Sequence, residues 1–310
     1  MSNLLVFDAV YEKLLRVATC LAMEGFGEAL QLATLSKTLY NDPILWGVLK
    51  KHRGPSSRTF LMHAVEEKRI DRARFLLDRG AAIEAIDRNK ITALIMACQK
   101  GHLEIAQLLI ERGANVNAAR TTDGMTALMM AIFYRKHGIA QLLIDKGANV
   151  NAARTDGMTA MMWASLDDGQ EITQLLVEKG ANVNAASTFT GMTSLMYASQ
   201  RGAQKIAQLL VERGANVSAA RTDNGNTALM MAIFYGHWEI ARLLINKGAN
   251  VNAARTDNGM TALMCASKYS YLEIVRLLLN NGADKAAVNN QGLIALHFTG
   301  CAKIQALLTL

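Results

Sequence analysis

Proline is almost missing from this 310-residue chain, which has it only at positions 43 and 55. Proline breaks helices and is abundant in disordered segments. Its scarcity, together with 51% hydrophobic and 19% charged residues, excludes a disordered chain and indicates a folded, mainly helical protein with a core to bury.

Cysteine is also scarce. The four cysteines, Cys20, Cys98, Cys265 and Cys301, lie far apart, and no pair has the Cys-x-x-Cys spacing of a redox or zinc motif. We therefore expect free thiols that are buried as small apolar side chains. Free thiols are typical of a reducing compartment, so the chain is expected in the cytoplasm, with the nucleus as the alternative.

No long apolar segment is present that could cross a membrane, and Asp8 and Glu12 interrupt the stretch where a signal peptide would lie. The net charge of +7 is spread thinly: residues 58–90 carry eight basic and six acidic side chains, whereas residues 158–191 carry one basic and four acidic. A nucleic-acid-binding protein usually concentrates Lys and Arg on one face. We therefore expect neither a membrane nor a nucleic acid as partner.

Catalytic motifs are absent as well. The sequence has no phosphate-binding glycine loop after a strand, no Gly-x-Ser-x-Gly and no His-Glu-x-x-His. The acidic group of Asp167, Asp168 and Glu171 has no His or Cys at ligand spacing, so it is interpreted as a solvated helix end and not as a metal site. We expect no enzyme activity, no cofactor and no metal.

What the chain does contain is a repeat with a period of 33 or 34 residues. Each copy opens with a threonine: Thr59, Thr92, Thr126, Thr159, Thr193, Thr227 and Thr261. Each copy closes with a glycine: Gly80, Gly113, Gly147, Gly180, Gly214, Gly248 and Gly282. Self-similarity at a fixed period of this size is the signature of a repeat array, in which neighbouring units must stack to bury their apolar faces.

The copy that begins near residue 125 shows how one unit should fold. Thr126 can cap a first helix, and a second helix is predicted at about residues 138–146 with apolar side chains at helical spacing. Gly147 supplies the left-handed conformation that ends this second helix. Val150 then anchors the following connection, which we call the finger, to the core.

These units resemble ankyrin repeats in the order of the two helical segments, the Gly-Ala-Asn/Asp loop and the period. The resemblance covers residues 58–310, with units that start near 58, 91, 125, 158, 192, 226 and 260 and a short last unit from 293. It implies an all-α solenoid of helix-turn-helix units. It also implies a non-enzymatic scaffold for protein–protein interaction, which binds a partner chain or peptide in its concave groove.

The opening motif departs from the family pattern. Thr-Pro-Leu-His becomes Thr-Ala-Leu-Met in three of the seven copies and ends in methionine in six, with the family's histidine kept only at His297. We expect methionine to fill the position of the lost histidine and to make a more purely hydrophobic spine. The last unit ends without a closing glycine and is interpreted as an imperfect cap.

The fingers also depart from the pattern, because four copies carry Arg-Thr where the family commonly has Asp. These fingertip arginines are Arg120, Arg154, Arg221 and Arg255, and each has an aspartate two or three residues later. Two interpretations remain open: contact with acidic partners, or local pairing with the nearby carboxylate. Four fingers are also one residue longer than the 33-residue unit, which the loop should accommodate.

Four, seven and eight residues after the opening threonine, the family presents side chains towards the concave groove. Aromatic residues gather at these positions: Phe133, Tyr134, Trp163, Tyr197, Phe234, Tyr235 and Tyr269. Large, rigid aromatic side chains dominate protein interfaces. A polar rim is predicted beside them: Gln99, Lys100, Gln200, Arg201 and Lys268. Alternatively, some rings, Phe133 and Phe234 above all, merely fill gaps between adjacent helices.

Residues 1–57 lie outside the repeat register and are predicted to form three helices, at about 4–24, 26–40 and 43–52. The tail of this segment, from Leu32 to Trp46, resembles the second half of an F-box, although the opening Leu-Pro of that family is missing. The resemblance implies docking on an adaptor of cullin-type ubiquitin ligases through Leu35, Pro43, Leu45 and Trp46. The chain would then be a substrate-recognition subunit, whereas the alternative is a helical cap on the array.

Overall fold

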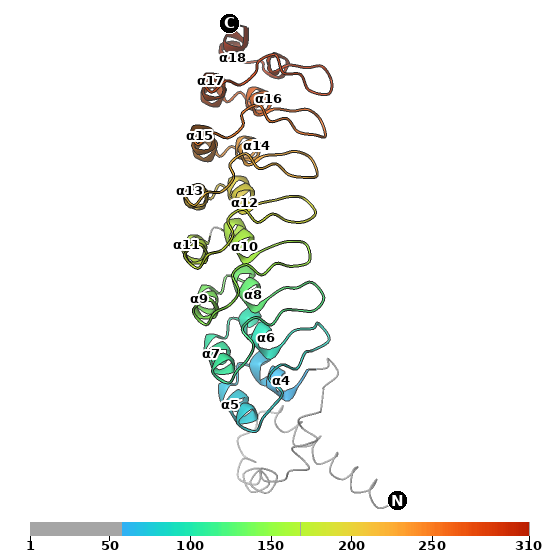
Figure 1. The fold of residues 1–310 in the computed structure, drawn as a ribbon, viewed down its shortest axis with the longest axis vertical. Helices are drawn as coiled ribbons and strands as arrows, with labels where there is room; N and C mark the ends of the chain where they lie inside the picture. Colours follow the sequence, from blue (N-terminus) through green and yellow to red (C-terminus); the bar gives the residue numbers. More distant parts are fainter. Residues whose placement is uncertain (1–57, 168, 310) are drawn as a thin grey trace, which may run out of the picture.

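The computed structural model describes residues 58–167 and 169–309, and these form a stack of seven helix pairs followed by a shorter last unit (Figure 1). The first helices of the pairs are α4 (Phe60–Glu66), α6 (Ala93–Lys100), α8 (Ala127–Phe133), α10 (Ala160–Leu166), α12 (Ser194–Arg201), α14 (Ala228–Phe234) and α16 (Ala262–Lys268). The second helices are α5 (Ile70–Asp78), α7 (Leu103–Glu111), α9 (His137–Asp145), α11 (Gln170–Glu178), α13 (Gln204–Glu212), α15 (Trp238–Asn246) and α17 (Leu272–Asn280).

The three parts of each unit lie in three parallel columns. In Figure 1 the first helices form the middle column, the second helices lie on one side of it, and the fingers project on the other side. The last unit has a 3-10 helix, Ala295–Phe298, in place of a first α-helix, followed by α18 (Ala302–Thr309). The predicted all-α array is thus confirmed for the described residues, and the predicted helices of residues 1–57 lie outside them.

The opening threonines cap the first helices as predicted. Thr126 has extended backbone angles, and its hydroxyl oxygen accepts a hydrogen bond from the backbone N–H of Met129 at 3.2 Å. The same bond recurs at the start of every first α-helix from α4 to α16. A helix of seven or eight residues leaves its first N–H groups unpaired, so this bond stabilises each unit directly.

The residue whose N–H binds the threonine is methionine in most units, and it forms the expected hydrophobic spine. Met129, Met196 and Met230 are buried in one core that runs along the described units, and Met162 is fully buried as well. In the last unit the retained histidine behaves differently, because His297 Nδ1 accepts a hydrogen bond from the N–H of Ile294 at 3.1 Å. Methionine replaces such polar contacts with apolar packing volume.

The closing glycines end the second helices in the left-handed conformation. Gly147 has a φ of 84°, and the next N–H, of Ala148, returns to the carbonyl of Leu143. Val150 is then buried, as predicted. The second helix of this unit spans His137–Asp145, one residue earlier at each end than predicted.

The extra residue of the longer fingers lies at the fingertip. In the long finger of residues 113–126 the N–H of Gly124 bonds the carbonyl of Arg120, whereas in the shorter finger of residues 147–159 the equivalent bond joins Gly157 to Arg154. Neighbouring fingers are joined by backbone bonds, such as that from the N–H of Thr155 to the carbonyl of Asp123 at 2.9 Å. The fingers from residues 113–126 to residues 282–293 therefore form a continuous hydrogen-bonded layer.

Candidate binding surface

The aromatic side chains singled out in the sequence lie in two rows. Trp163 and Tyr197, four residues after their threonines, are half-buried against the bases of the fingers. The hydroxyl of Tyr197 donates a hydrogen bond to the sulfur of Met158 at 3.2 Å, and burial raises the pKa of Tyr197. The other row stands at the ends of the first helices, where the rings are more exposed.

We call Gln99, Phe133, Tyr134 and Trp163 the N-terminal aromatic cluster. The Phe133 ring meets Tyr134 and Trp163 edge-on, with centroid distances of 5.0 and 4.9 Å. The side-chain amide of Gln99 donates a hydrogen bond to the Tyr134 hydroxyl at 3.2 Å. Phe133 is 46% exposed and Tyr134 38%, so these rings pack across neighbouring repeats and also present apolar area to solvent.

We call Gln200, Phe234, Tyr235 and Tyr269 the C-terminal aromatic cluster. The Phe234 ring meets Tyr235 and Tyr269 edge-on at 5.0 and 5.9 Å. Gln200 donates to the Tyr235 hydroxyl, again at 3.2 Å. Phe234 is 51% exposed and Tyr235 47%. Each phenylalanine ring therefore packs between two repeats and remains half exposed, and its role in binding a partner stays a prediction.

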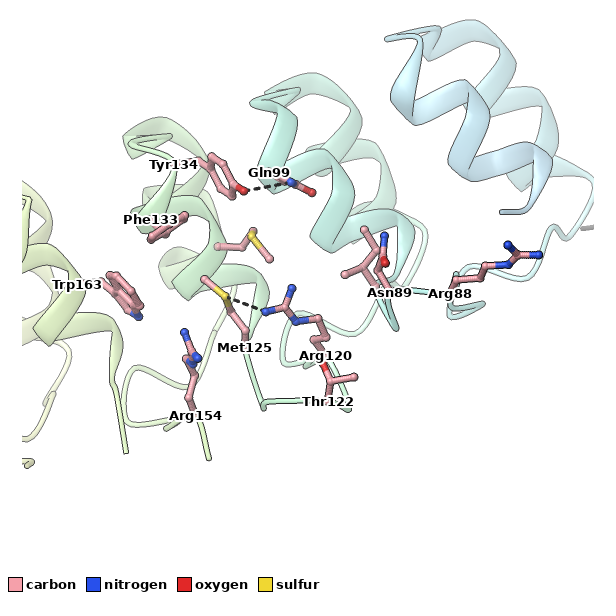
Figure 2. Close-up of a pocket in the computed structure, with 12 residues that line it drawn as sticks. Arg88, Asn89, Gln99, Arg120, Thr122, Met125, Phe133, Tyr134, Arg154 and Trp163 are labelled. Carbon is pink, nitrogen blue, oxygen red and sulfur yellow. Dashed lines mark hydrogen bonds between the residues drawn. The ribbon is translucent and has the colours of Figure 1, made fainter. Parts of the chain in front are cut away.

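Two hollows flank the Phe133–Trp163 pair. The larger, of about 530 Å³, extends to the fingers, where Arg88, Arg120 and Arg154 line it (Figure 2). The smaller, of about 380 Å³, lies towards the next repeats. Its charged lining comprises Arg135, Asp167 and Arg201, of which Arg135 and Asp167 form an ion pair.

The predicted fingertip arginines are partly buried and pair with aspartates. Arg120, Arg221 and Arg255 each direct two guanidinium nitrogens at the two oxygens of an aspartate in the same finger. The hydrogen bonds from Arg120 are the main reason why the pKa of Asp123 is lowered. Local pairing, one of the two interpretations of these arginines, is confirmed, and contact with an acidic partner stays a prediction.

Arg154 differs from the other three arginines. Its guanidinium lies 3.6 Å from Asp123 and 3.3 Å from Asp156, and it stands over the Trp163 ring at 6.0 Å. Neither Arg154 Nε nor Trp163 Nε1 has a hydrogen-bond partner, although both atoms are buried. An unpaired buried donor is costly. This place in the larger hollow therefore holds two buried donors that are not satisfied.

The predicted rim residues lie beside the clusters. Lys100, Arg201 and Lys268 are exposed at the last turns of their helices. None of these cations has a carboxylate of the described residues within 4.0 Å, whereas Asp123 and Asp167 on the same side are paired with arginines. The surface therefore has more free positive than negative charge.

One exposed ring on the fingers was not predicted from the sequence. Phe189, 76% exposed, occupies the tip of the finger between α11 and α12. Ser187 stands in this finger where four others have arginine, so the pair of arginine and aspartate is absent. The available signal was the loss of the Arg-Thr pair that the two fingers before this one and the two after it carry.

The adaptor-docking residues Leu35, Pro43, Leu45 and Trp46 lie outside the described residues. Within residues 58–167 and 169–309, no three His, Cys, Asp or Glu side chains come together as metal ligands. Every helix in the same ranges is too short or too polar to span a lipid bilayer.

Comparison with known proteins relates these repeats to one family. The family model for ankyrin repeats, in three copies, matches residues 61–154, 149–221 and 218–289. Among solved structures, the ankyrin repeat domain of human ASB11 matches with a TM-score of 0.59 and 26% sequence identity. That match covers 71% of this chain and 97% of the ASB11 chain.

Curated relatives match over shorter stretches. Human Ankyrin repeat and KH domain-containing protein 1 is 38% identical over 69 residues, and Inversin of Gallus gallus is 40% identical over 67. Each match covers 22% of this chain, but only 3% and 6% of the length of those relatives. Human Ankyrin repeat domain-containing protein 63 is 39% identical over 71 residues, which cover 19% of its length.

Proposed function

The chain belongs to the ankyrin-repeat family, and from this premise we propose that it is a non-enzymatic binding protein that holds a partner protein or peptide along its first helices and fingers. The observation that carries the proposal is the run of half-exposed aromatic side chains from Phe133 to Tyr269 on one side of the stack. These rings offer apolar area on a rigid scaffold, with free hydrogen-bonding and charged groups at their edges.

The arrangement suits an extended or helical segment of a partner better than a small molecule. The two hollows are open depressions along the stack, and the aromatic residues continue over several repeats beyond them. Small-molecule sites are usually enclosed and concave. A partner that lies across several units would contact both rows of rings and the basic rim.

The proposal is tested by affinity purification with the full chain as bait, followed by mass spectrometry. The double variant Trp163→Ala with Tyr197→Ala should lose the partners that the wild-type chain recovers. Leu103→Ala is the matched control, because Leu103 is 44% exposed on the second helix α7, outside the aromatic rows. Thermal unfolding of each variant shows whether the array is intact. A folded double variant with an unchanged set of partners would contradict the proposal.

A narrower version, in which residues 1–57 dock a ubiquitin-ligase adaptor and the repeats select the substrate, rests on the sequence resemblance alone. This version is tested by asking whether residues 1–57 are needed to recover such an adaptor. The double variant Leu45→Ala with Trp46→Ala should abolish that recovery. Recovery of partners without any adaptor, together with destabilisation of the array on deletion of residues 1–57, would assign a capping role. The location in cytoplasm or nucleus is likewise a proposal, which imaging of the tagged chain tests.

A further inference from the structure

We propose that the surface carries two equivalent subsites, three repeats apart, and that its partner is one acidic segment that presents the same short motif twice. Each subsite is one aromatic cluster together with the cation beside its glutamine: Lys100 at the N-terminal cluster and Arg201 at the C-terminal cluster. This inference rests on the proposed function and specifies the chemistry of the partner.

The two subsites have matching sequences. Residues 126–134 and 227–235 are identical, and Gln99-Lys100 corresponds to Gln200-Arg201 at the same offset of 101 positions. The repeats between them do not carry this set. In the unit that opens at Thr159, the positions of the Phe-Tyr pair hold Leu166 and Asp167. This set of surface residues is therefore not present in every unit, but recurs after three units.

The two subsites also have matching geometry. In both, glutamine donates to the tyrosine hydroxyl of the next repeat at 3.2 Å, and the Phe and Tyr centroids lie 5.0 Å apart in an edge-on arrangement. A third ring from the following unit completes each cluster, Trp163 in one and Tyr269 in the other. The same partner motif would thus find the same glutamine, tyrosine hydroxyl and exposed phenylalanine at both places, whereas the third ring differs: Trp163 lies four residues after its threonine and Tyr269 eight residues after its own.

The charge of the subsites selects an acidic partner. Lys100 and Arg201 are exposed and have no carboxylate of the described residues within 4.0 Å, as is also true of Lys268 near the C-terminal cluster. Asp167, which lines the smaller hollow together with Arg201, is already paired with Arg135. An acidic segment would supply the missing counter-charges and would associate faster at low salt.

Two equal subsites on one rigid array favour a bivalent partner. Once one motif is bound, the second binds as an intramolecular event at high effective concentration. This effect typically raises affinity by a factor of about 10²–10⁴ when the linker matches the span. A partner with one motif would instead bind weakly and occupy either subsite.

The experiment uses the full chain and a phage-displayed library of 12-residue peptides. The library is selected on the wild-type chain and, in parallel, on Tyr134→Ala with Tyr235→Ala; thermal unfolding verifies that this variant is folded. The best enriched peptide is then titrated by calorimetry, alone and as a tandem joined by a flexible linker. We expect peptides with Asp or Glu around an apolar residue, and two binding sites per chain for the single peptide. The single variants Tyr134→Ala and Tyr235→Ala should each keep one site. The tandem should bind once, about a hundredfold more tightly or better.

Further variants separate charge from apolar contact. Lys100→Glu with Arg201→Glu should weaken the single peptide about tenfold or more, whereas Leu103→Ala should leave its affinity unchanged. Equal enrichment on the wild type and the double tyrosine variant, including none on either, would overturn the inference, as would selection of basic peptides. Self-association of the chain through this surface, without peptide enrichment, would also overturn it. A single site per chain would refute the two subsites and leave the proposed function intact, because that function is judged by partner recovery with the Trp163 and Tyr197 variant.

Discussion

Gln200 donates its side-chain amide to the hydroxyl of Tyr235 at 3.2 Å, so a polar contact on the exposed surface joins two neighbouring repeats. Tyr235 is 47% exposed and Gln200 is only partly buried, so the glutamine amide can bond water when the tyrosine hydroxyl is removed. We therefore expect Tyr235→Phe to change the free energy of unfolding by less than about 0.5 kcal/mol. Urea unfolding followed by circular dichroism measures this change. A loss of about 1 kcal/mol or more would mean that this bond helps to hold the repeats together.

The capping threonines should contribute far more to stability than the surface tyrosines. Thr227 accepts the N–H of Met230 at 3.3 Å, and its side chain is buried. Thr227→Ala removes the acceptor and leaves that N–H unpaired, so it should destabilise the array by about 1 kcal/mol. Thr227→Ser keeps the hydroxyl and is the matched control. Equal urea midpoints for the two variants would show that the hydroxyl is not what stabilises the helix start.

Substitution of two glycines with similar backbone angles distinguishes the cost of the left-handed conformation from the cost of close packing. Gly147 has a φ of 84° and open space where a Cβ would stand, whereas Gly157 has a φ of 79° and a Cβ there would lie 2.6 Å from the backbone nitrogen of Thr188. Gly147→Ala should therefore cost about 1–2 kcal/mol for the left-handed conformation alone. Gly157→Ala should cost at least about 1 kcal/mol more, because the next finger must move. Thermal and urea unfolding of both variants measure the difference, and equal losses would contradict a tight contact between fingers.

One serine in the core should be replaceable with a gain in stability. Ser194 is fully buried at the start of α12, its Oγ has no hydrogen-bond partner, and five other first helices have alanine at this position. Ser194→Ala removes an unpaired polar group and adds helix propensity, so the free energy of unfolding should rise by about 1 kcal/mol. Ser165→Ala is the control, because Ser165 is equally buried but donates to the carbonyl of Met161 at 2.9 Å. A loss of stability in Ser194→Ala would show that its hydroxyl is bonded after all.

The repeat fold could be predicted from the sequence because each unit contains residues that mark its own start and end. Thr126 and Gly147 mark a capped start and a left-handed end, and such local signals recur with a period that only stacked units can use. The side-chain contacts of the surface could be predicted only in part from the sequence. The sequence placed Trp163 and Phe133 on one face, but their contact is set by side-chain directions across two repeats. The incomplete pairing of Arg154 depends on the distance between two fingers, which no periodic pattern encodes.

The ion pairs of the fingers should make the array sensitive to acid. Hydrogen bonds from Arg120 lower the pKa of Asp123, and Arg154 adds a smaller contribution in the same direction. Because the folded-state pKa is below the unfolded value of about 3.9, the pair stabilises the fold above that value. The contribution is lost as the pH falls through the folded-state pKa. We expect Asp123→Asn to be less stable than wild type at neutral pH and to approach wild-type stability below about pH 4. Urea midpoints measured between neutral pH and pH 3 test this, and a constant difference across the range would mean that the Asp123 charge is not what the fingers depend on.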